Sequence, residues 1–220
     1  MYFILFMKFG QLGTGTNQQG PAQVIGSFDP LNIYAGLYNL YIQSKNGSVY
    51  GCGYYQNYLL PLWDATSPRK LQHFERIIQI SSSGRHTLFL SNSSQVYGFG
   101  GNQQGELGLG TISQFVSPPQ MIPFLNNVSD IYTGYFHSIV ITNNGSVYCF
   151  GYNNYGQLGL GDLIYNMYTN IESPTFNIFL SYTNITKISL GYYYSIVFEN
   201  DELVLLERIV ILQKTPVYPL

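Results

Sequence analysis

Residues 143–161 read NNGSVYCFGYNNYGQLGLG, and the fold of the whole chain can be predicted from this stretch. It contains an Asn-Gly pair, a short segment rich in β-forming residues, and a loop punctuated by glycine. Its segment CFG at 149–151 corresponds to GFG at 98–100 and to GCG at 51–53. Self-similarity at a spacing of about 50 residues is typical of repeat architectures.

The glycine loop that ends this stretch also recurs. GQLGLG at 156–161 corresponds to GELGLG at 105–110 and to GQLGTG at 10–15. An independent landmark has spacings of 47, 51 and 57 residues along the series Ile33, Ile80, Ile131 and Ile188. The same three spacings separate the tetrapeptides that start at Gly36, Ser83, Gly134 and Gly191. Because unrelated landmarks stay in step, we expect about four units of one architecture.

The composition argues against several classes of function. Only 9% of the 220 residues are charged, and the formal net charge is −2. Binding of nucleic acid needs clustered cations that displace counterions from phosphates, so we expect no nucleic-acid partner. His73, His86 and His137 are isolated from one another and from cysteine pairs, so we expect no metal site. Cys52 and Cys149 fall in different units and are interpreted as buried free thiols.

The apolar opening MYFILFMKF at 1–9 is interpreted as a strand. It lacks a basic leader and a small-residue cleavage site, and it is too short to span a bilayer. Asn-x-Ser/Thr sequences begin at Asn46, Asn92, Asn127, Asn144 and Asn184. Without a secretory signal, we do not expect these asparagines to be glycosylated. The sequence therefore predicts a cytoplasmic or nuclear protein that is not secreted and does not contact a membrane.

Four segments in equivalent positions are nearly continuous in apolar residues: LYIQS at 40–44, TLFLS at 87–91, SIVIT at 138–142 and SIVFE at 195–199. A strand with one face in water alternates apolar and polar residues, whereas a strand covered on both faces need not. The first three segments are followed by polar turns and by the returning strands SVYGCG, QVYGFG and SVYCFG. Small sheets need neighbours to cover their faces, so we expect them to stack as propeller blades.

Some regions depart from the repeat. At 58–63 the sequence YLLPLW replaces the glycine loop, and its path must differ because residues other than glycine rarely adopt positive φ. The connection at 162–184 is longer than its counterparts. Residues 200–204 are expected to form a turn and a returning strand, but no glycine loop follows. We therefore divide the chain into a repeat region at 1–204 and a divergent tail at 205–220, which is either truncated or out of frame, or a natural capping strand.

Three motifs carry a resemblance to a known repeat family: Gly134-x-x-His137-Ser138, Gly145-x-Val147-Tyr148-x-x-Gly151 and Asn153-x-x-Gly156-Gln157-Leu158-Gly159-Leu160-Gly161. They closely resemble the repeat of the regulator of chromosome condensation (RCC1) family. The block at 84–110 matches nearly as well, and the resemblance covers roughly residues 9–204. It implies an all-β fold, a partial β-propeller of about four RCC1-type blades from a ring that commonly has seven. The remaining blades or a second chain would be needed to close that ring, because an open arc exposes apolar blade faces.

The recurring residues of these motifs are interpreted as architectural. The glycines permit tight turns and close approach of neighbouring blades: Gly10, Gly13, Gly15, Gly100, Gly105, Gly108, Gly110, Gly134, Gly151, Gly156, Gly159 and Gly161. His86 and His137 share one repeat position with Asn39 and Tyr194, which favours a hydrogen-bonding role over acid–base catalysis. No phosphate-binding loop and no nucleophile–base pair is recognisable, so we expect neither a cofactor nor a catalytic residue.

Two functions stay open for such a chain. The first is a protein–protein interaction or regulatory module. The second, which the resemblance implies for some family members, is guanine-nucleotide exchange on a small Ran-type GTPase. Fold alone does not decide between them. The long connection at 162–184 is the predicted interaction loop, through Asp162, Tyr165, Tyr168 and Glu172. The alternative is a lengthened surface connection without a partner.

Overall fold

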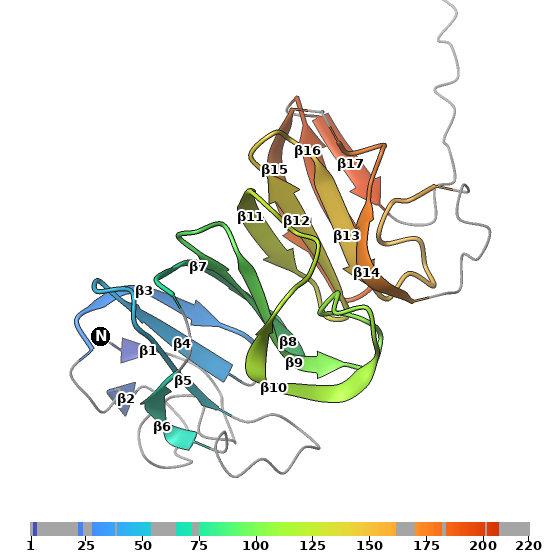
Figure 1. Ribbon diagram of the computed structural model, residues 1–220. Helices are drawn as coiled ribbons and strands as arrows, with labels where there is room; N and C mark the ends of the chain where they lie inside the picture. The colour runs from blue at the N-terminus through green and yellow to red at the C-terminus, as the bar shows by residue number, and fades with distance from the viewer. Residues whose placement is uncertain are drawn as a thin grey trace, which may run out of the picture.

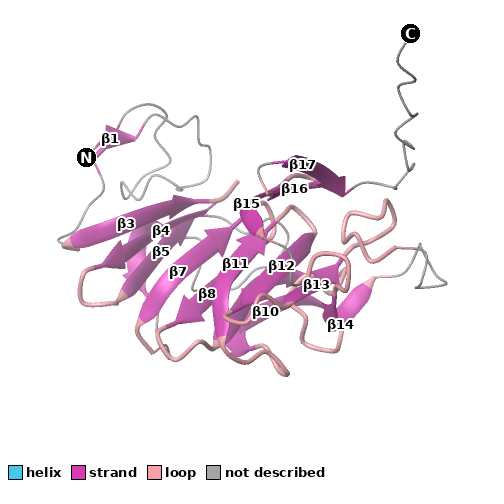
Figure 2. Cartoon of the chain, turned by 90° about the horizontal axis from the view of Figure 1, so that it is seen from above, coloured by secondary structure: helices cyan, strands magenta, loops and turns pink. Residues whose placement is uncertain are grey.

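A computed structural model of the chain describes residues 2–3, 22–23, 28–37, 39–53, 65–71, 75–161, 170–181, 184–200 and 202–206. These residues form strands joined by turns and loops, and no helix occurs among them. Figure 1 and Figure 2 show the strands gathered into successive small sheets. The all-β fold expected from the sequence is confirmed.

Each sheet is an antiparallel meander whose spatial order follows the chain, and the four larger sheets are called blades 1 to 4. Blade 1 contains β3 (Pro30–Ala35), β4 (Asn39–Ser44), β5 (Val49–Gly53) and β6 (Ala65–Lys70). Blade 2 contains β7 (Ile77–Ser82), β8 (His86–Ser91), β9 (Val96–Asn102) and β10 (Ser113–Met121). Blade 3 contains β11 (Val128–Thr133), β12 (His137–Thr142), β13 (Val147–Gly151) and β14 (Ile171–Phe176). Blade 4 contains β15 (Ile185–Leu190), β16 (Ser195–Glu199) and β17 (Glu202–Leu206), and a separate pairing joins β1 (Tyr2–Phe3) to β2 (Ala22–Gln23).

The first strands of the blades lie against one another. β7 contacts both β3 and β11, and β11 also contacts β15. The last strands, β6, β10 and β14, lie at the opposite edges of their sheets. The blades therefore follow one another along an arc, from the blue sheet to the orange sheet in Figure 1, as in a partial propeller.

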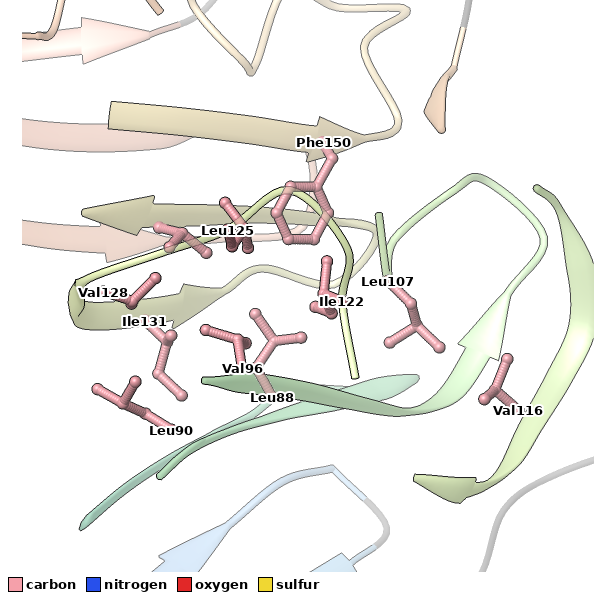
Figure 3. Packing of buried hydrophobic residues seen from close by; sticks show 11 residues of the cluster. Leu88, Leu90, Val96, Leu107, Val116, Ile122, Leu125, Val128, Ile131 and Phe150 are labelled. Carbon is pink, nitrogen blue, oxygen red and sulfur yellow. The ribbon is translucent and has the colours of Figure 1, made fainter. Parts of the chain in front are cut away.

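The largest core cluster lies between blades 2 and 3. Figure 3 shows Leu88 and Val96 of blade 2 near Ile131 of blade 3, with Phe150 and Leu107 further along the same interface. All five side chains are buried. Burial of one such side chain stabilises the fold by roughly 1.5–3 kcal/mol. Neither blade buries these residues alone, so the core of the protein lies between its sheets.

The neighbouring interfaces follow the same plan. Between blades 1 and 2, the rings of Tyr41 and Phe89 meet edge to face at 5.4 Å, next to the buried Ile77. Between blades 3 and 4, Ile139 packs in one cluster with Val197. Each interface thus contains side chains from the central strands of two blades, which stabilises the stack.

Burial of the central strands agrees with the sequence pattern. All six residues of β4 and all six of β8 are buried. A neighbouring blade covers each face of β8, which explains why its sequence does not alternate. β16, in the last blade, instead alternates between buried and partly exposed positions.

The predicted turns are also present. Gly47 and Gly145 have φ of 83° and 80° in the hairpin turns of blades 1 and 3, and Ser94 has φ of 63° in blade 2. The strand expected after the turn at residue 200 is β17, which pairs with β16 and extends past residue 204 to Leu206, opposite Ser195. The predictions for residues 4–15, for 58–63 and for the chain after Leu206 lie outside the described residues.

Candidate functional site

His86 and His137 occupy the same position in successive blades. His86 begins β8 and pairs with Gly100, and His137 begins β12 and pairs with Gly151. Both glycines have positive φ, 108° and 105°. A Cβ at Gly151 would lie 2.5 Å from the carbonyl oxygen of Phe136 and 2.7 Å from the Cα of His137. Glycine is therefore required opposite the histidine.

The His86 side chain links blade 2 to blade 3. Its Nε2 lies 2.7 Å from the hydroxyl oxygen of Ser138, and that hydroxyl donates to the carbonyl oxygen of Glu106 at 2.9 Å. A serine hydroxyl has one proton, so the hydrogen on Nε2 must be the one donated to Ser138. Nδ1 of His86 then carries no hydrogen, and it has no hydrogen-bond partner among the residues that the structure describes. The imidazole is thus a neutral donor at the blade interface.

His137 repeats this arrangement one blade further on. Its Nε2 lies 2.8 Å from the Ser195 hydroxyl of blade 4, and Ser195 donates to the carbonyl oxygen of Gln157 at 2.8 Å. Within the described ranges, Nδ1 of His137 again has no hydrogen-bond partner. Two successive interfaces are therefore joined by the same histidine–serine–carbonyl link, and each carbonyl belongs to the glycine loop of the blade that supplies the histidine.

The surroundings of the two rings hold them neutral. Burial, with smaller contributions from the neighbouring His137 and Arg85, lowers the pKa of His86 from 6.5 to about 3. Burial lowers the pKa of His137 to about 4. Both side chains are fully buried. A group with such a pKa and no access to solvent is poorly suited to acid–base catalysis near neutral pH.

Blade 1 makes a related link with different groups. Ser82 of blade 2 donates to Oδ1 of Asn39 at 2.8 Å, and Ser82 and Thr87 have hydroxyl oxygens 2.9 Å apart. The Tyr41 hydroxyl lies 3.0 Å from that of Thr87. Thr87 is at the repeat position that Ser138 has in blade 3 and Ser195 in blade 4. In blade 4 the equivalent residue, Tyr194, is exposed. The position therefore forms a polar contact to the next blade in blades 1, 2 and 3.

The glycine loops after β9 and β13 each bury one polar side chain. Oε2 of Glu106 accepts a hydrogen bond from the backbone N–H of Gln104 at 2.7 Å, and burial raises the pKa of this carboxyl. In blade 3 the same position is Gln157, whose Oε1 accepts from the backbone N–H of Tyr155 at 3.1 Å. In the part of the chain that the structure describes, Glu106 Oε1 and Gln157 Nε2 have no hydrogen-bond partner. Both loops therefore have a side-chain oxygen that accepts a backbone hydrogen bond, but only the loop of blade 2 has an ionisable side chain at this position.

The glycine loop of blade 2 packs on blade 3. Gly108 has φ of 62°, and a Cβ there would lie 3.0 Å from the Phe150 ring. Gly110 donates its backbone N–H to the carbonyl oxygen of Glu172 at 2.8 Å. Glu172, one of four residues predicted for the interaction loop, thus lies in β14 with its side chain exposed. The other three, Asp162, Tyr165 and Tyr168, lie outside the described residues, as do Gly10, Gly13 and Gly15.

Aromatic side chains gather where the loops before β12 and β16 and the loop after β13 meet. We call this surface the tyrosine face, and it comprises Arg85, Tyr135, Phe136, Tyr152, Tyr155, Tyr192 and Tyr193. The rings of Tyr135 and Tyr192, from blades 3 and 4, stack at 4.0 Å. This face was not among the sites predicted from the sequence. The signal that could have located it is the aromatic pair before the histidine position in the third and fourth repeats, Tyr135-Phe136 and Tyr192-Tyr193.

The two cysteines are not part of the tyrosine face. Cys52 and Cys149 are buried thiols, and burial raises the pKa of each to about 12, which leaves both unreactive. No set of three His, Cys, Asp or Glu side chains in the described ranges is placed to hold a metal ion. Within the same ranges, the structure contains no helix with the length and apolar character needed to cross a membrane.

Comparison with protein families gives two matches. One model of the regulator of chromosome condensation (RCC1) repeat matches residues 93–141 and 144–198, and another matches 77–106 and 128–157. The ultraviolet-B receptor UVR8 of Arabidopsis thaliana is 29% identical over 163 residues, which cover 70% of this chain and 37% of the receptor. The human E3 ubiquitin-protein ligase HERC2 is 28% identical over 151 residues, 64% of this chain and 3% of the ligase. The chain thus spans well under half the length of these relatives.

Solved structures show the same fold. Yeast RCC1 (Prp20), solved with Kap60 bound to it, matches with a TM-score of 0.75 at 20% identity, over 90% of this chain and 49% of that one. A second structure of Prp20p from Saccharomyces cerevisiae, studied with its binding to Gsp1p and histones, gives a TM-score of 0.72 at 19% identity, with coverages of 86% and 49%. Human WBSCR16 gives 0.71 at 20% identity, with coverages of 90% and 54%. These likenesses confirm the partial propeller, about half as long as each solved chain.

Proposed function

Because the chain belongs to the regulator of chromosome condensation (RCC1) repeat family, we propose that it acts as a protein-binding regulatory module. The tyrosine face carries this proposal. Tyr155, Tyr192 and Tyr193 are 51%, 44% and 40% exposed, although large aromatic side chains gain stability from burial. Exposed clusters of tyrosine are typical of surfaces that bind other proteins.

The buried titratable groups support a role without catalysis. His86 and His137 are engaged between blades and lie beyond the reach of a substrate. Glu106 is also buried, and its accepting oxygen is bonded to a backbone N–H of its own loop. These groups stabilise the stack of blades, so binding is left to the exposed loops.

Relatives with this fold bind proteins. Structures of the yeast relative concern its complex with Kap60 and its binding to Gsp1p and histones. Kap60, Gsp1p and histones are named for that yeast protein and not for this chain. They support the general inference that an RCC1-type propeller presents surfaces to other proteins, and the identity of the partner of this chain is left to experiment.

Affinity capture with the full chain tests the proposal. Wild-type chain and the Tyr193→Ala variant are immobilised side by side, and bound proteins are identified by mass spectrometry. We expect specific partners on the wild-type chain that are reduced at least about fivefold on the variant, because central aromatic residues dominate interface energetics. If both chains retain the same proteins in equal amounts, the tyrosine face is not the binding surface.

Guanine-nucleotide exchange on a small Ran-type GTPase is the alternative function. The observation that favours it is the likeness to Prp20p, which was studied with Gsp1p. Release of a fluorescent guanine nucleotide from the GTPase is the direct assay. Acceleration by the chain would establish the alternative, and an unchanged release rate would remove it.

Location and the long connection complete the proposal. We propose a cytoplasmic or nuclear location, where other blades or a second chain complete the ring. The connection at 162–184 is proposed as a secondary contact, and its residue Glu172 is exposed on β14. Microscopy of a fluorescent fusion tests the location, and Glu172→Ala in the capture experiment tests the contact.

A further inference from the structure

The tyrosine face is organised around Phe136. Its ring is nearly parallel to that of Tyr193, with centroids 5.9 Å apart and 16° between planes, and it meets Tyr192 edge to face at 5.2 Å and 87°. Tyr192 and Tyr193 meet at 4.4 Å and 77°, and Tyr155 lies 4.9 Å from Tyr193 at 58°. The rings therefore do not share one plane. They present both edges and faces, against which other ring-shaped side chains pack well.

A hollow of about 500 Å³ adjoins these rings. It is lined by Tyr135 and Tyr192 and by residues near the ends of the first strands, among them Gly36, Ser82 and Leu190. Because Tyr135 and Tyr192 belong to both, the hollow and the tyrosine face form one continuous surface. This surface extends across residues of all four blades, and such a length suits an extended peptide segment better than a single compact side chain.

Among the described residues, Arg85 supplies the only formal charge on the tyrosine face. Its guanidinium carbon lies 5.3 Å from the centroid of the Phe136 ring, and Nη2 donates to Oε1 of Gln103 at 2.7 Å. Burial raises the pKa of the Glu106 carboxyl and Arg85 partly offsets this rise, but the Glu106 side chain is fully buried and does not reach the surface. A cationic group of a binding partner would be repelled by Arg85, because no carboxylate among the described residues of this surface offsets that charge. A carboxylate of a binding partner would instead pair with Arg85.

We propose that the tyrosine face binds an extended, proline-containing peptide segment that carries a carboxylate, a proposal that rests on the proposed protein-binding function. Proline rings pack against aromatic rings, and a polyproline II segment loses little conformational entropy on binding. Its backbone carbonyls make no internal hydrogen bonds, so they accept from tyrosine hydroxyls. The carboxylate pairs with Arg85, whose guanidinium has N–H donors beyond the one given to Gln103.

Fluorescence anisotropy with synthetic peptides tests the chemistry of the occupant. The full chain is titrated into a fluorescein-labelled peptide of sequence Asp-Pro-Pro-Leu-Pro-Pro, with two matched peptides that carry alanine for every proline or lysine for the aspartate. We expect saturable binding of the first peptide, and binding at least about fivefold weaker for each of the others.

Variants of the chain test the location. Tyr193→Ala removes an exposed ring from the centre of the face, so we expect it to weaken binding about tenfold. Arg85→Gln removes the charge, so we expect the aspartate and lysine peptides to bind equally. Phe124→Ala is the matched control, because Phe124 is an exposed aromatic residue in the connection between β10 and β11, and it should leave the affinity unchanged.

The remaining outcomes overturn the proposal. Equal binding of the proline and alanine peptides would remove the role of proline, and tighter binding of the lysine peptide would show a cationic occupant. A dimer of the chain that dissociates in Tyr193→Ala would identify a second copy as the occupant. Absence of peptide binding, with captured partners that are lost in Tyr193→Ala, would overturn this inference and leave the proposed function standing. Absence of both would overturn both.

Discussion

Blades 2 and 3 have the same histidine–serine–carbonyl link and differ in the charges around it. The glycine loop buries Glu106 in blade 2 and Gln157 in blade 3. The residue before the histidine is Arg85 in blade 2 and Phe136 in blade 3. The buried position requires an acceptor for a backbone N–H and permits either charge state. The position before the histidine is only partly buried and has no such requirement, so its residue differs between the blades. The tyrosine face includes this position.

Acidification should produce the largest loss of stability, because it acts on the buried histidines that blades 2 and 3 share. Both histidines have lowered pKa values, about 3 for His86 and about 4 for His137, against an ordinary value of 6.5. Their contribution to the free energy of unfolding is therefore complete above about pH 6.5 and is lost as the pH falls toward the folded pKa values. We expect a loss on the order of 3 kcal/mol for each histidine by pH 4, measured by urea unfolding.

The control for this pH profile is a chain with His86→Asn and His137→Asn, which cannot take up these protons. Its free energy of unfolding should change far less between pH 7 and pH 4. Glu106 acts in the opposite direction, because its raised pKa contributes stability below its ordinary value that is lost as the pH rises. A wild-type profile as flat as that of the double variant would contradict the assignment of buried neutral histidines.

Removal of one link should have the next largest effect. His137→Ala deletes a fully buried ring and leaves the Ser195 hydroxyl without its donor, so we expect a loss of about 3 kcal/mol in the free energy of unfolding. His137→Asn should recover part of it, since blade 1 has Asn39 at this position. A loss below about 0.5 kcal/mol in His137→Ala would show that the link between blades 3 and 4 contributes little.

Exchange of the loop residues sharpens the contrast between the blades. Glu106→Gln removes a buried carboxyl whose pKa is raised, so the stability of the variant relative to wild type should increase as the pH rises above the ordinary carboxyl pKa. Gln157→Glu should show the reverse dependence in blade 3. Both are followed by thermal and urea unfolding. If the two variants change in the same direction with pH, the burial of the charge is not the cause.

The smallest effect on stability is expected on the tyrosine face. Tyr193→Ala should change the free energy of unfolding by less than about 0.5 kcal/mol, because the side chain is 40% exposed and contacts other exposed rings. The measurement is the urea midpoint, with Phe89→Ala as the buried aromatic comparison. A loss comparable to that of Phe89→Ala would show that the cluster stabilises the fold.

Much of the fold could be predicted because it is local or periodic. The strands at 87–91 and 138–142, the Asn-Gly turn at 144–145 and the glycine loop at 105–110 are all present as expected. The connection at 162–184, in contrast, was predicted to bind a partner from its length and composition alone. That prediction stays open, since Glu172 is the only one of its four proposed residues within the described ranges.

The sequence by itself determined that about four similar sheets must cover one another, because apolar runs without alternation need a neighbour on each face. Only the tertiary structure decided which atoms join them. His86 reaches a serine 52 positions away, and Tyr135 stacks on a ring from the next blade. Such contacts depend on the angle and separation of the packed sheets. Many weak side-chain contacts together set that angle and separation, and no single repeat encodes them.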